Sequence, residues 1–569
     1  MRPSPAGMGF ASESASHSNR SLGLPPGCNV ESPVSRLHHR KWEKPLLNAH
    51  ASSPLQATYD LMEALAALTD DMRTALRKHD FDSVEKLSDK NSELRAQLAS
   101  SQAKLAQYRV ETREEVEVVR QLREFTTKVA EGDRLFRLWK QDLVTYKLFG
   151  VKEIRNAVMN IQHLRKAKRV GSLRDAFKGQ PAIVVAAGPS RDKQFPLLRE
   201  YADRAVVFTM NRCVDAFIDQ NIVPDFLLVT DSQPAIPKLH LARSNAQTMP
   251  TVVSRVSVDP AVFEYDANHR FCYTDGHDHE NGVMKLLGLP SFDKLPGMSV
   301  AHSSLLMAYH LGCSPIILVG QDLAFTDNRY YAKSDQDDIK ITLSDDGKIA
   351  LTSESPREVE AGIQRGAATE VVDVPGYYGT PVSTSSGMAK MITYYECIME
   401  EIGDAAHVIN ATEGGAHLKG MEHLPFKEAL ETYCTDHVDA QATIAEITAA
   451  IPAYKTADEA RALLTGLEKR IGRVEQLAKS CLKLLPKAET SKKHVQKLKD
   501  LYAELGRTQE PLDHLFATVN ILDKLDEHLE GVKELDTIAS LKRDFRTIQR
   551  AAARLRPFPT EALERFRDN

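Results

Sequence analysis

The sequence predicts an α/β fold whose core is a mainly parallel, doubly wound sheet. Between residues 175 and 410, short apolar or β-branched runs alternate with stretches of helical pattern. Most runs are separated by about twenty residues or more, which is enough for a helix that crosses over between parallel strands. The expected strands are PAIVVAA, RAVVFTM, DFLLVT, TVVSRVSV, RFCYTDG, SPIILVG and AHVIN.

The patterns on either side of this region predict helical domains. Residues 1–52 are rich in Ser, Pro, Gly and His and predict a disordered tail. Residues 53–172 carry leucines at three- and four-residue steps, which predicts a helical N-terminal domain. Residues 173–428 are expected to form a Rossmann-like domain, and residues 429–569 a C-terminal helical bundle.

One long helix of the expected bundle has a near-heptad apolar spacing. We expect Pro486 to close that helix, because proline breaks the backbone hydrogen-bond ladder. The positions that should face the core are Leu464, Leu467, Ile471, Val474, Ala478 and Cys481.

Composition limits the classes of function. The formal net charge of -5 gives no basic field for nucleic acid. No apolar run is long enough to span a membrane, and the N-terminus lacks a secretory apolar block, so we expect a cytoplasmic protein. The 7 cysteines are scattered without a CxxC pair, which indicates neither a disulfide framework nor a structural zinc site.

Small or hydrogen-bonding residues follow five of the expected strands. Turns favour such residues anyway, but the carboxyl ends of parallel strands meet at one edge and form the ligand crevice of open sheets. We therefore expect a binding site there. The residues at these strand ends are Gly188-Pro189-Ser190, Asn211, Asp231-Ser232, Gly320-Gln321-Asp322 and Asn410-Ala411-Thr412-Glu413-Gly414-Gly415.

The first of these turns favours an anionic ligand. It should open a helix, whose N-terminus attracts phosphate, and Gly188 allows close backbone approach. The segment is neither G-x-G-x-x-G, nor a P-loop, nor G-x-S-x-G, so dinucleotide, NTPase and hydrolase functions lack support. Ser190 is interpreted as a helix cap or ligand contact rather than a nucleophile. Asn211 and Asp231 could hydrogen-bond a nucleobase or ribose. Asp322 could hydrogen-bond a hydroxyl of the ligand or act as a catalytic base.

Longer motifs resemble the motility-associated flagellin glycosyltransferases. They are AAGPS, MNRC, PDFLLVTDSQP, GMSVAHSSLLMAYHLGCSPIILVGQDLAFTD and INATEGGAHLKG, in this order over about residues 175–425. The resemblance implies transfer of a nonulosonic acid, of the pseudaminic or legionaminic type, from a CMP-activated donor to Ser or Thr of flagellin. It implies flagellin as partner and no cofactor beyond the donor substrate. A metal ligand set is not indicated.

The same core is similar to bacterial CMP-sialic-acid sialyltransferases, which implies roles for single residues. Gly188, Pro189, Ser190, Asn211, Met298 and Ser299 match positions that hold the donor nucleotide. Asp322 matches an aspartate after a later strand, and Tyr331 lies near a tyrosine that supports the leaving phosphate. Two positions depart: Ala187 replaces an asparagine, and Gly376 stands where those enzymes carry a histidine base.

Several groups could replace that base. Tyr377, Tyr378 and Asp373 are close in sequence, and Glu413, flanked by glycines, is a further catalytic candidate or a helix N-terminal charge. The remaining donor-binding candidates come from the strand ends alone. They are Asp231, Gly320, Gln321, Asn410 and Thr412.

Two further segments and two further functions were weighed. TDGHDHENG at 274–282 is interpreted as a polar surface loop, with a metal or acceptor site as the alternative. Residues 58–105 loosely resemble a flagellar export-chaperone helix; internal packing is favoured over docking of such a partner. The alternative functions are a pterin pyrophosphokinase-like enzyme, which would need ATP, magnesium and a Lys or Arg clamp, and a non-catalytic flagellar assembly factor.

Overall fold

The structure is a computed structural model that describes residues 149–567 with internal gaps, and single positions between 61 and 97. The expected tail and most of the expected N-terminal helical domain therefore lie outside the described residues. The internal gaps are 234–239, 276–277, 289–294, 296, 336–338, 344–347, 354–368, 489–491, 510–511, 513–514 and 516–536.

A nine-stranded sheet with only parallel pairings forms the centre of the described chain, in the order β1-β6-β5-β4-β3-β2-β7-β12-β13. The predicted α/β fold is confirmed, as are all seven expected strands. The two additional strands, β1 and β13, are two-residue edge strands. The strands are β1 Lys168–Arg169, β2 Ala182–Val185, β3 Val206–Met210, β4 Phe226–Val229, β5 Thr251–Arg255, β6 His269–Tyr273, β7 Ile316–Val319, β12 Val408–Asn410 and β13 Glu422–His423.

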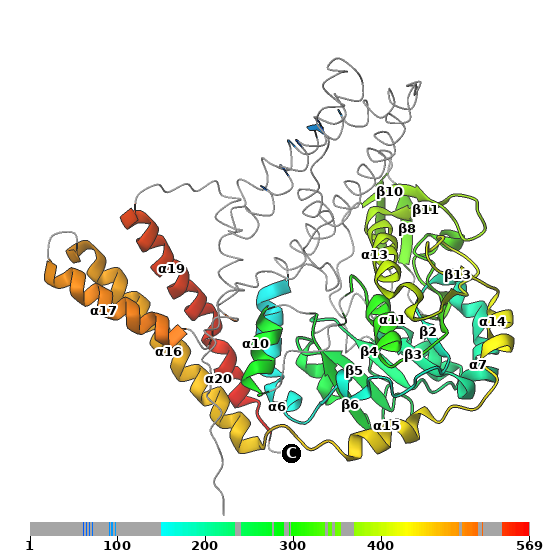
Figure 1. Ribbon diagram of the computed structural model, residues 1–569, viewed down its shortest axis with the longest axis horizontal. Coiled ribbons are helices and arrows are strands. Elements are labelled where there is room, and N and C mark those ends of the chain that lie inside the picture. The colour runs from blue at the N-terminus through cyan, green and yellow to red at the C-terminus, as the bar shows by residue number, and fades with distance from the viewer. Residues whose placement is uncertain are drawn as a thin grey trace, which may run out of the picture.

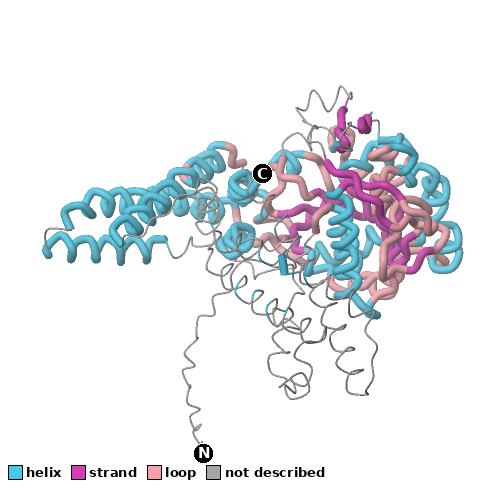
Figure 2. Tube along the Cα trace, turned by 90° about the horizontal axis from the view of Figure 1, so that it is seen from above, coloured by secondary structure: helices cyan, strands magenta, loops and turns pink. Residues whose placement is uncertain are grey.

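Helices cover both faces of this sheet (Figure 2). Strand side chains alternate between the faces, so Val184 packs with one apolar cluster and Ile183 with the other. The first cluster includes α11 and α13, and the second includes α7, α8 and α14. The bounds are α7 Phe195–Tyr201, α8 Val214–Asp219, α11 Val300–His310, α13 Ser386–Ile402 and α14 Phe426–Tyr433.

A second, antiparallel sheet is inserted between β7 and β12 and packs beside α13 (Figure 1). The sequence analysis expected no strands in this region. The bounds are β8 Ile339–Leu343, β9 Lys348–Ser353, β10 Thr369–Val374 and β11 Val382–Ser385, in the order β11-β10-β9-β8.

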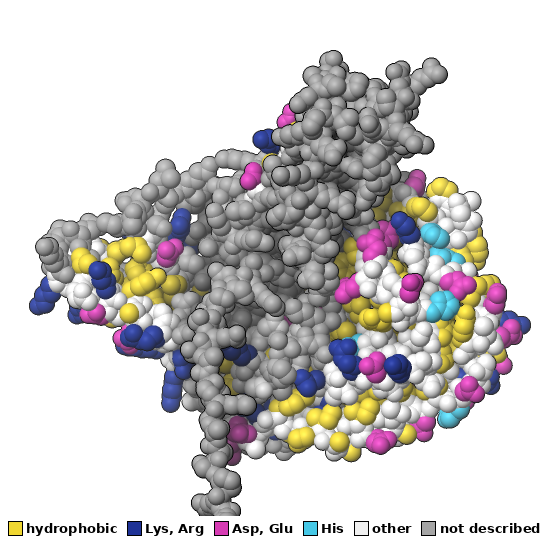
Figure 3. All heavy atoms as spheres, viewed as in Figure 1, with side chains coloured by type: hydrophobic (Ala, Val, Ile, Leu, Met, Phe, Trp, Pro, Cys, Tyr) yellow, Lys and Arg dark blue, Asp and Glu magenta, His cyan; other side chains and the backbone are white. Residues whose placement is uncertain are grey.

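The C-terminal helices form an arm beside the sheet (Figure 1), and on the face in Figure 3 hydrophobic side chains gather along it. All six expected core positions of α16 are buried. Pro486 does not close the helix as expected, because α16 continues to Ala488. The helices are α15 Ala440–Ala449, α16 Ala457–Ala488, α17 Lys492–Gln509, α19 Thr537–Leu555 and α20 Pro557–Glu564.

Two further helices belong to the described sheet region, besides the helical residues 149–159 that precede them. They are α6 Ile161–Leu164, which precedes β1, and α10 Asp278–Leu286, which follows β6. Within the described residues, none of the helices combines the length and apolarity that crossing a membrane requires.

Candidate functional site

The strand order places a crevice beside β2. From β2 the chain adds β3, β4, β5 and β6 on one side, whereas β7 and β12 lie on the other. The connections that leave β2 and β7 therefore diverge at the carboxyl edge, and open parallel sheets bind ligands at such a switch point. The turns after β2, β7 and β12 meet here, as the sequence analysis expected.

Three glycines pack these turns together. A Cβ on Gly188 would overlap the Asp322 carboxylate, and one on Gly414 would overlap the Ser190 hydroxyl. Gly415 has a φ of +69°, and a Cβ there would overlap the backbone of Asp322. Only glycine fits this contact between the strand ends.

Asp322 ties the turn after β2 to the turn after β7. Its side chain is buried and accepts hydrogen bonds from Ser190 N, at 3.2 Å to each oxygen, and from Ser190 Oγ at 2.6 Å. Burial raises the pKa of Asp322, while hydrogen bonds from Ser190 and Thr326 oppose that rise. Ser190 is therefore no helix cap; its hydroxyl donates to Asp322, and Asp322 acts as a positioning residue.

A cavity of about 1170 Å³ opens above these turns. The turns after β2, β7 and β12 form one wall, and the segment around β10 and β11 forms the other. Its lining includes three cations, three carboxylates, two tyrosines and one serine of the candidate site. These residues are Lys193, Arg329, Lys333, Asp192, Asp327, Glu413, Tyr377, Tyr378 and Ser190.

Glu413 has a fixed position at the cavity edge. Its φ is +55°, and its Oε2 accepts hydrogen bonds from Phe426 N at 3.2 Å and Gln194 Nε2 at 3.4 Å. The carboxylate thus lies at the N-terminus of α14, where the helix dipole favours negative charge. Its backbone carbonyl accepts from Lys193 Nζ at 2.6 Å and Tyr378 Oη at 3.0 Å.

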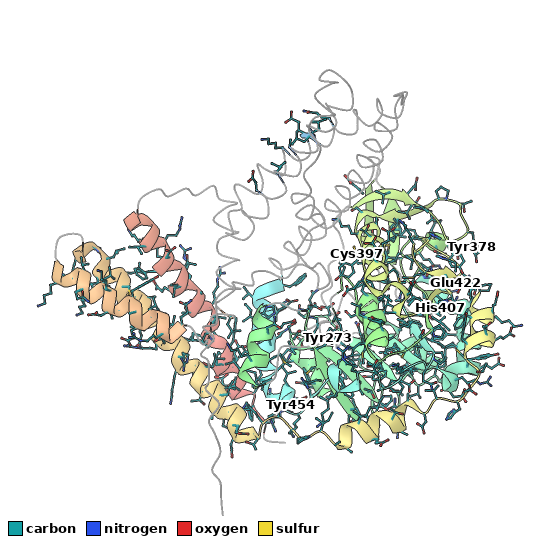
Figure 4. All side chains as sticks on the ribbon, in the orientation of Figure 1. Tyr273, Tyr378, Cys397, His407, Glu422 and Tyr454 are labelled. Carbon is teal, nitrogen blue, oxygen red and sulfur yellow. The ribbon has the colours of Figure 1, made fainter. Side chains whose placement is uncertain are left out.

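Two tyrosines form the aromatic wall. Their ring centroids lie 4.9 Å apart in an edge arrangement, and Tyr378 is 72% exposed at the rim (Figure 4). Tyr377 Oη donates to the carbonyls of Asn410 and Leu424. Burial, and then Glu413, raise the pKa of both hydroxyls, which favours their protonated form and disfavours the role of base considered above. Each instead offers an aromatic surface to a ligand.

The loop that carries Tyr331 lies over the ends of β2 and β3. Ala332 N donates to Ala187 O at 2.9 Å, and the Arg212 guanidinium lies 3.9 Å from the Tyr331 ring centroid. Buried Arg191 bonds Ser334 Oγ at 2.5 Å. Tyr331 is thus at the carboxyl edge, but it is not part of the described cavity lining.

Three other candidates hold the turns together rather than reach the cavity. Thr412 Oγ1 accepts from Gln321 N at 3.0 Å, and Asn410 Oδ1 accepts from Thr412 N at 3.1 Å. Gln321 Oε1 accepts from Tyr395 Oη of α13 at 3.0 Å. All three candidate side chains are buried. Gly320, with a φ of +68°, shapes the turn itself.

The remaining candidates lie in a second sector of the same edge. Asn211 follows β3, Asp231 follows β4, and Ser299 precedes α11, which packs across β2, β3 and β4. Burial raises the pKa of Asp231, and Ser299 Oγ bonds His302 Nδ1 at 2.8 Å. Neither these residues nor Met298 belong to the described cavity lining.

The prediction that residues 274–282 form a polar surface loop is wrong for the described residues at its centre. His279 and Glu280 are fully buried, because Glu280 pairs with Arg255 at the end of β5 at 3.0 Å. Arg255 also pairs with Glu153 at 3.1 Å and Asp275 at 2.9 Å. The acidic residues therefore neutralise a buried cation. Across the described residues, no cluster of three or more His, Cys, Asp or Glu has metal-binding geometry.

Sequence reasoning missed the three cations and the second sheet. Lys193 and Lys333 are 140 positions apart by number, so no local motif links them. The hairpin of β8 and β9 did carry a signal. Its sequence, IKITLSDDGKIALTS, alternates apolar and polar residues around Asp-Asp-Gly, which is typical of a β-hairpin.

Comparisons with known proteins cover part of the chain. A family model described as 6-hydroxymethylpterin diphosphokinase MptE-like matches residues 155–328, less than half of the chain. Among solved structures, the chain is similar to the MAf glycosyltransferase from Magnetospirillum magneticum AMB-1, at 16% identity and a TM-score of 0.45. That match covers 72% of this chain and 60% of that chain. No curated protein matches the chain.

Proposed function

We propose that this protein is a glycosyltransferase that moves a nonulosonic acid, of the pseudaminic or legionaminic type, from a CMP-activated donor to Ser or Thr of flagellin. Such a modification would serve filament assembly and motility. The observation that carries the proposal is the cavity at the switch point, whose lining includes both three cations and two tyrosines. The ordered motifs that resemble flagellin glycosyltransferases give the donor and acceptor classes.

The cavity has the chemistry that a nucleotide-sugar donor requires. Cations recognise phosphate, and aromatic side chains offer flat surfaces to a sugar or base. A volume of about 1170 Å³ lies at the upper end of small-ligand pockets and suits a donor of this size. The lining also carries the carboxylates Asp192, Asp327 and Glu413, so an anionic donor would be attracted locally by the cations rather than by a net positive charge of the whole cavity.

Transfer would break the bond between the anomeric carbon and the phosphate oxygen of CMP. The oxygen leaves with the electron pair, and Lys193, Arg329 and Lys333 stabilise its negative charge. The acceptor hydroxyl oxygen forms the new bond to the anomeric carbon and gives up its proton. Glu413 is the proposed base, because its carboxylate lines the cavity and is fixed by Phe426 N.

Asp322 and Tyr331 take supporting roles in this proposal. Asp322 positions Ser190, whose backbone and hydroxyl shape the donor turn. Tyr331 would reach the leaving phosphate when the donor fills the edge of the cavity, with Arg212 beside its ring. Asn211, Asp231, Met298 and Ser299 are the proposed contacts for any part of the donor that extends from the cavity into the second sector.

The direct test is transfer by the purified protein. Flagellin is incubated with a CMP-nonulosonic acid, and its intact mass is measured. We expect one or more sugar-mass additions, which Glu413→Gln should reduce and Arg329→Gln should reduce through a higher donor KM. Arg243→Gln, a distant surface substitution, is the matched control. Unchanged flagellin mass with folded protein and fresh donor would refute the proposal.

A second candidate is a 6-hydroxymethylpterin diphosphokinase-like enzyme. The family model matches residues 155–328, which include Lys193 and Asp322. The three lining cations, Lys193, Arg329 and Lys333, are candidates for the phosphate clamp that the sequence analysis did not find. Calorimetry separates the two functions: binding of ATP with magnesium but not of CMP favours the kinase, and the reverse favours the glycosyltransferase.

A further inference from the structure

A second cavity lies at the opposite end of the sheet from the candidate site. It has a volume of about 300 Å³ and includes the first two residues of β6, His269 and Arg270. Because β6 is parallel to β2 and β7, this is the amino edge of the sheet rather than the carboxyl edge. The two cavities share no lining residue.

The charged lining of this cavity is entirely basic within the described residues. It consists of two imidazoles, two lysines and one arginine, with no carboxylate among the lining side chains. Because like charges repel, gathering them in one cavity costs free energy unless a group of opposite charge is bound there. The basic residues are His163, Lys166, Lys168, His269 and Arg270.

Two of the cations donate hydrogen bonds to neutral backbone carbonyls rather than to carboxylates. Lys168 Nζ donates to Ile451 O, and Arg270 Nη1 donates to Val262 O at 3.2 Å. Burial lowers the pKa of both basic groups. Asp266, outside the lining, offsets part of this effect at Arg270. The cavity therefore holds positive charge that its own walls neutralise only in part.

The pKa of His163 reflects the electrostatic field inside the cavity. Its pKa is lowered to about 4, first by burial and then by Arg270, Arg165, Arg567 and Lys166. Cations that repel the imidazole proton from four positions would attract an anion to the same place. A bound anion would reverse the effect on the imidazole.

The walls are held in place before any ligand binds. The His163 ring stacks on Phe263 with centroids 4.8 Å apart and planes 4° apart. The Arg270 guanidinium, which comes from β6, lies 5.8 Å from the centroid of the same Phe263 ring. His269 Nδ1 is fixed by Thr448 Oγ1 of α15 at 3.1 Å. A preformed basic cavity needs little reordering on binding.

We propose that this cavity is a binding site for a phosphate group, free or carried by a small phosphate monoester. Lys166, Lys168 and Arg270 supply charge-assisted hydrogen bonds, and the small volume of the cavity suits a group of this size. The site is separate from the proposed donor cavity and does not depend on the proposed function.

The test uses the full-length protein and inorganic phosphate. The His163 imidazole is followed by histidine carbon-13 NMR, with His163→Gln identifying its signal, and chloride keeps the ionic strength constant. We expect saturating phosphate to raise the pKa of His163 above about 4. Lys166→Gln, at an exposed position, and Arg270→Gln should each weaken the affinity for phosphate at this site about tenfold, because each removes one charge-assisted hydrogen bond.

Lys193→Gln, in the other cavity, is the matched control and should leave the His163 response unchanged. Thermal unfolding checks that each variant is folded. Glycerol phosphate and a single-stranded oligonucleotide are tested in parallel arms. A His163 pKa that stays unchanged at saturating phosphate and glycerol phosphate would overturn the proposal. So would a response to the oligonucleotide alone, which would indicate a polymer surface instead.

Discussion

Arg255 is the residue whose removal should most damage the described sheet domain. It forms ion pairs of 2.9 to 3.1 Å with Glu153, Asp275 and Glu280, and the side chains involved are at most 14% exposed. Their charges raise the pKa of Arg255 well above its usual value, although burial opposes them. Arg255→Met would leave three carboxylates close together without their cation.

Breaking a buried ion pair from one side costs about 3–5 kcal/mol, because the remaining charge stays buried without a partner. At about 2–4 °C per kcal/mol for a domain of this size, Tm should fall by about 10 °C. Removing the Glu280 charge as well, in Arg255→Met with Glu280→Gln, should recover part of the loss, because one buried negative charge is then gone while Ser257 or Asp275 N can still donate to the side-chain oxygen.

Urea and thermal unfolding at pH 7 measure this loss. The matched control is Arg243→Met, because the 41% exposed Arg243 pairs with the equally exposed Asp219 at 2.7 Å and reaches the less exposed Asp215 only at 3.5 Å. An exposed pair of this kind contributes about 0–1 kcal/mol. If Arg255→Met cost no more than Arg243→Met, the buried network would not support the sheet and the reasoning would be refuted.

Three further variants, one of them a double substitution, test the site and the core. Gly414→Ala should lower stability by about 1–3 kcal/mol and weaken donor binding, since its Cβ would displace Ser190; equal calorimetry and unfolding curves would contradict this. Burial raises the pKa of Asp225 from 3.8 to about 6, so its contribution to stability is fully present below about pH 4 and is lost as pH rises through 6. Asp225→Asn should therefore flatten the decline in unfolding free energy between about pH 4 and 6; an unchanged slope would refute the assignment. Lys333→Gln together with Arg329→Gln should weaken CMP binding about tenfold or more with little change in Tm, because both side chains are exposed, whereas unaltered CMP affinity would remove them from the donor site.

The sheet could be predicted because each strand carries its own local signal. Fully buried parallel strands appear as apolar runs such as PAIVVAA, and crossover helices need long separations. The ends of those runs also placed Ser190, Asp322 and Glu413 near one another, since parallel strands bring their carboxyl ends to one edge. Edge strands of two residues, such as β1 and β13, have no comparable signal.

The cavity itself could not be predicted, because distant segments form it. Lys193 comes from the turn after β2, whereas Arg329 and Lys333 come from the long segment after β7. Which charges meet is decided by tertiary packing. The same reason explains the error at Glu280: a run of polar residues indicates a surface loop unless a buried partner such as Arg255 neutralises it.

The central claim is that the cavity beside β2 and β7 holds the nucleotide of the donor. A crystal structure of the protein soaked with CMP tests it most directly. We expect CMP in the cavity, with its phosphate within hydrogen-bond distance of Lys193, Arg329 or Lys333 and its remaining groups beside Tyr377 or Tyr378. CMP bound elsewhere with this cavity empty, or no CMP bound where ATP and magnesium do bind, would contradict the claim.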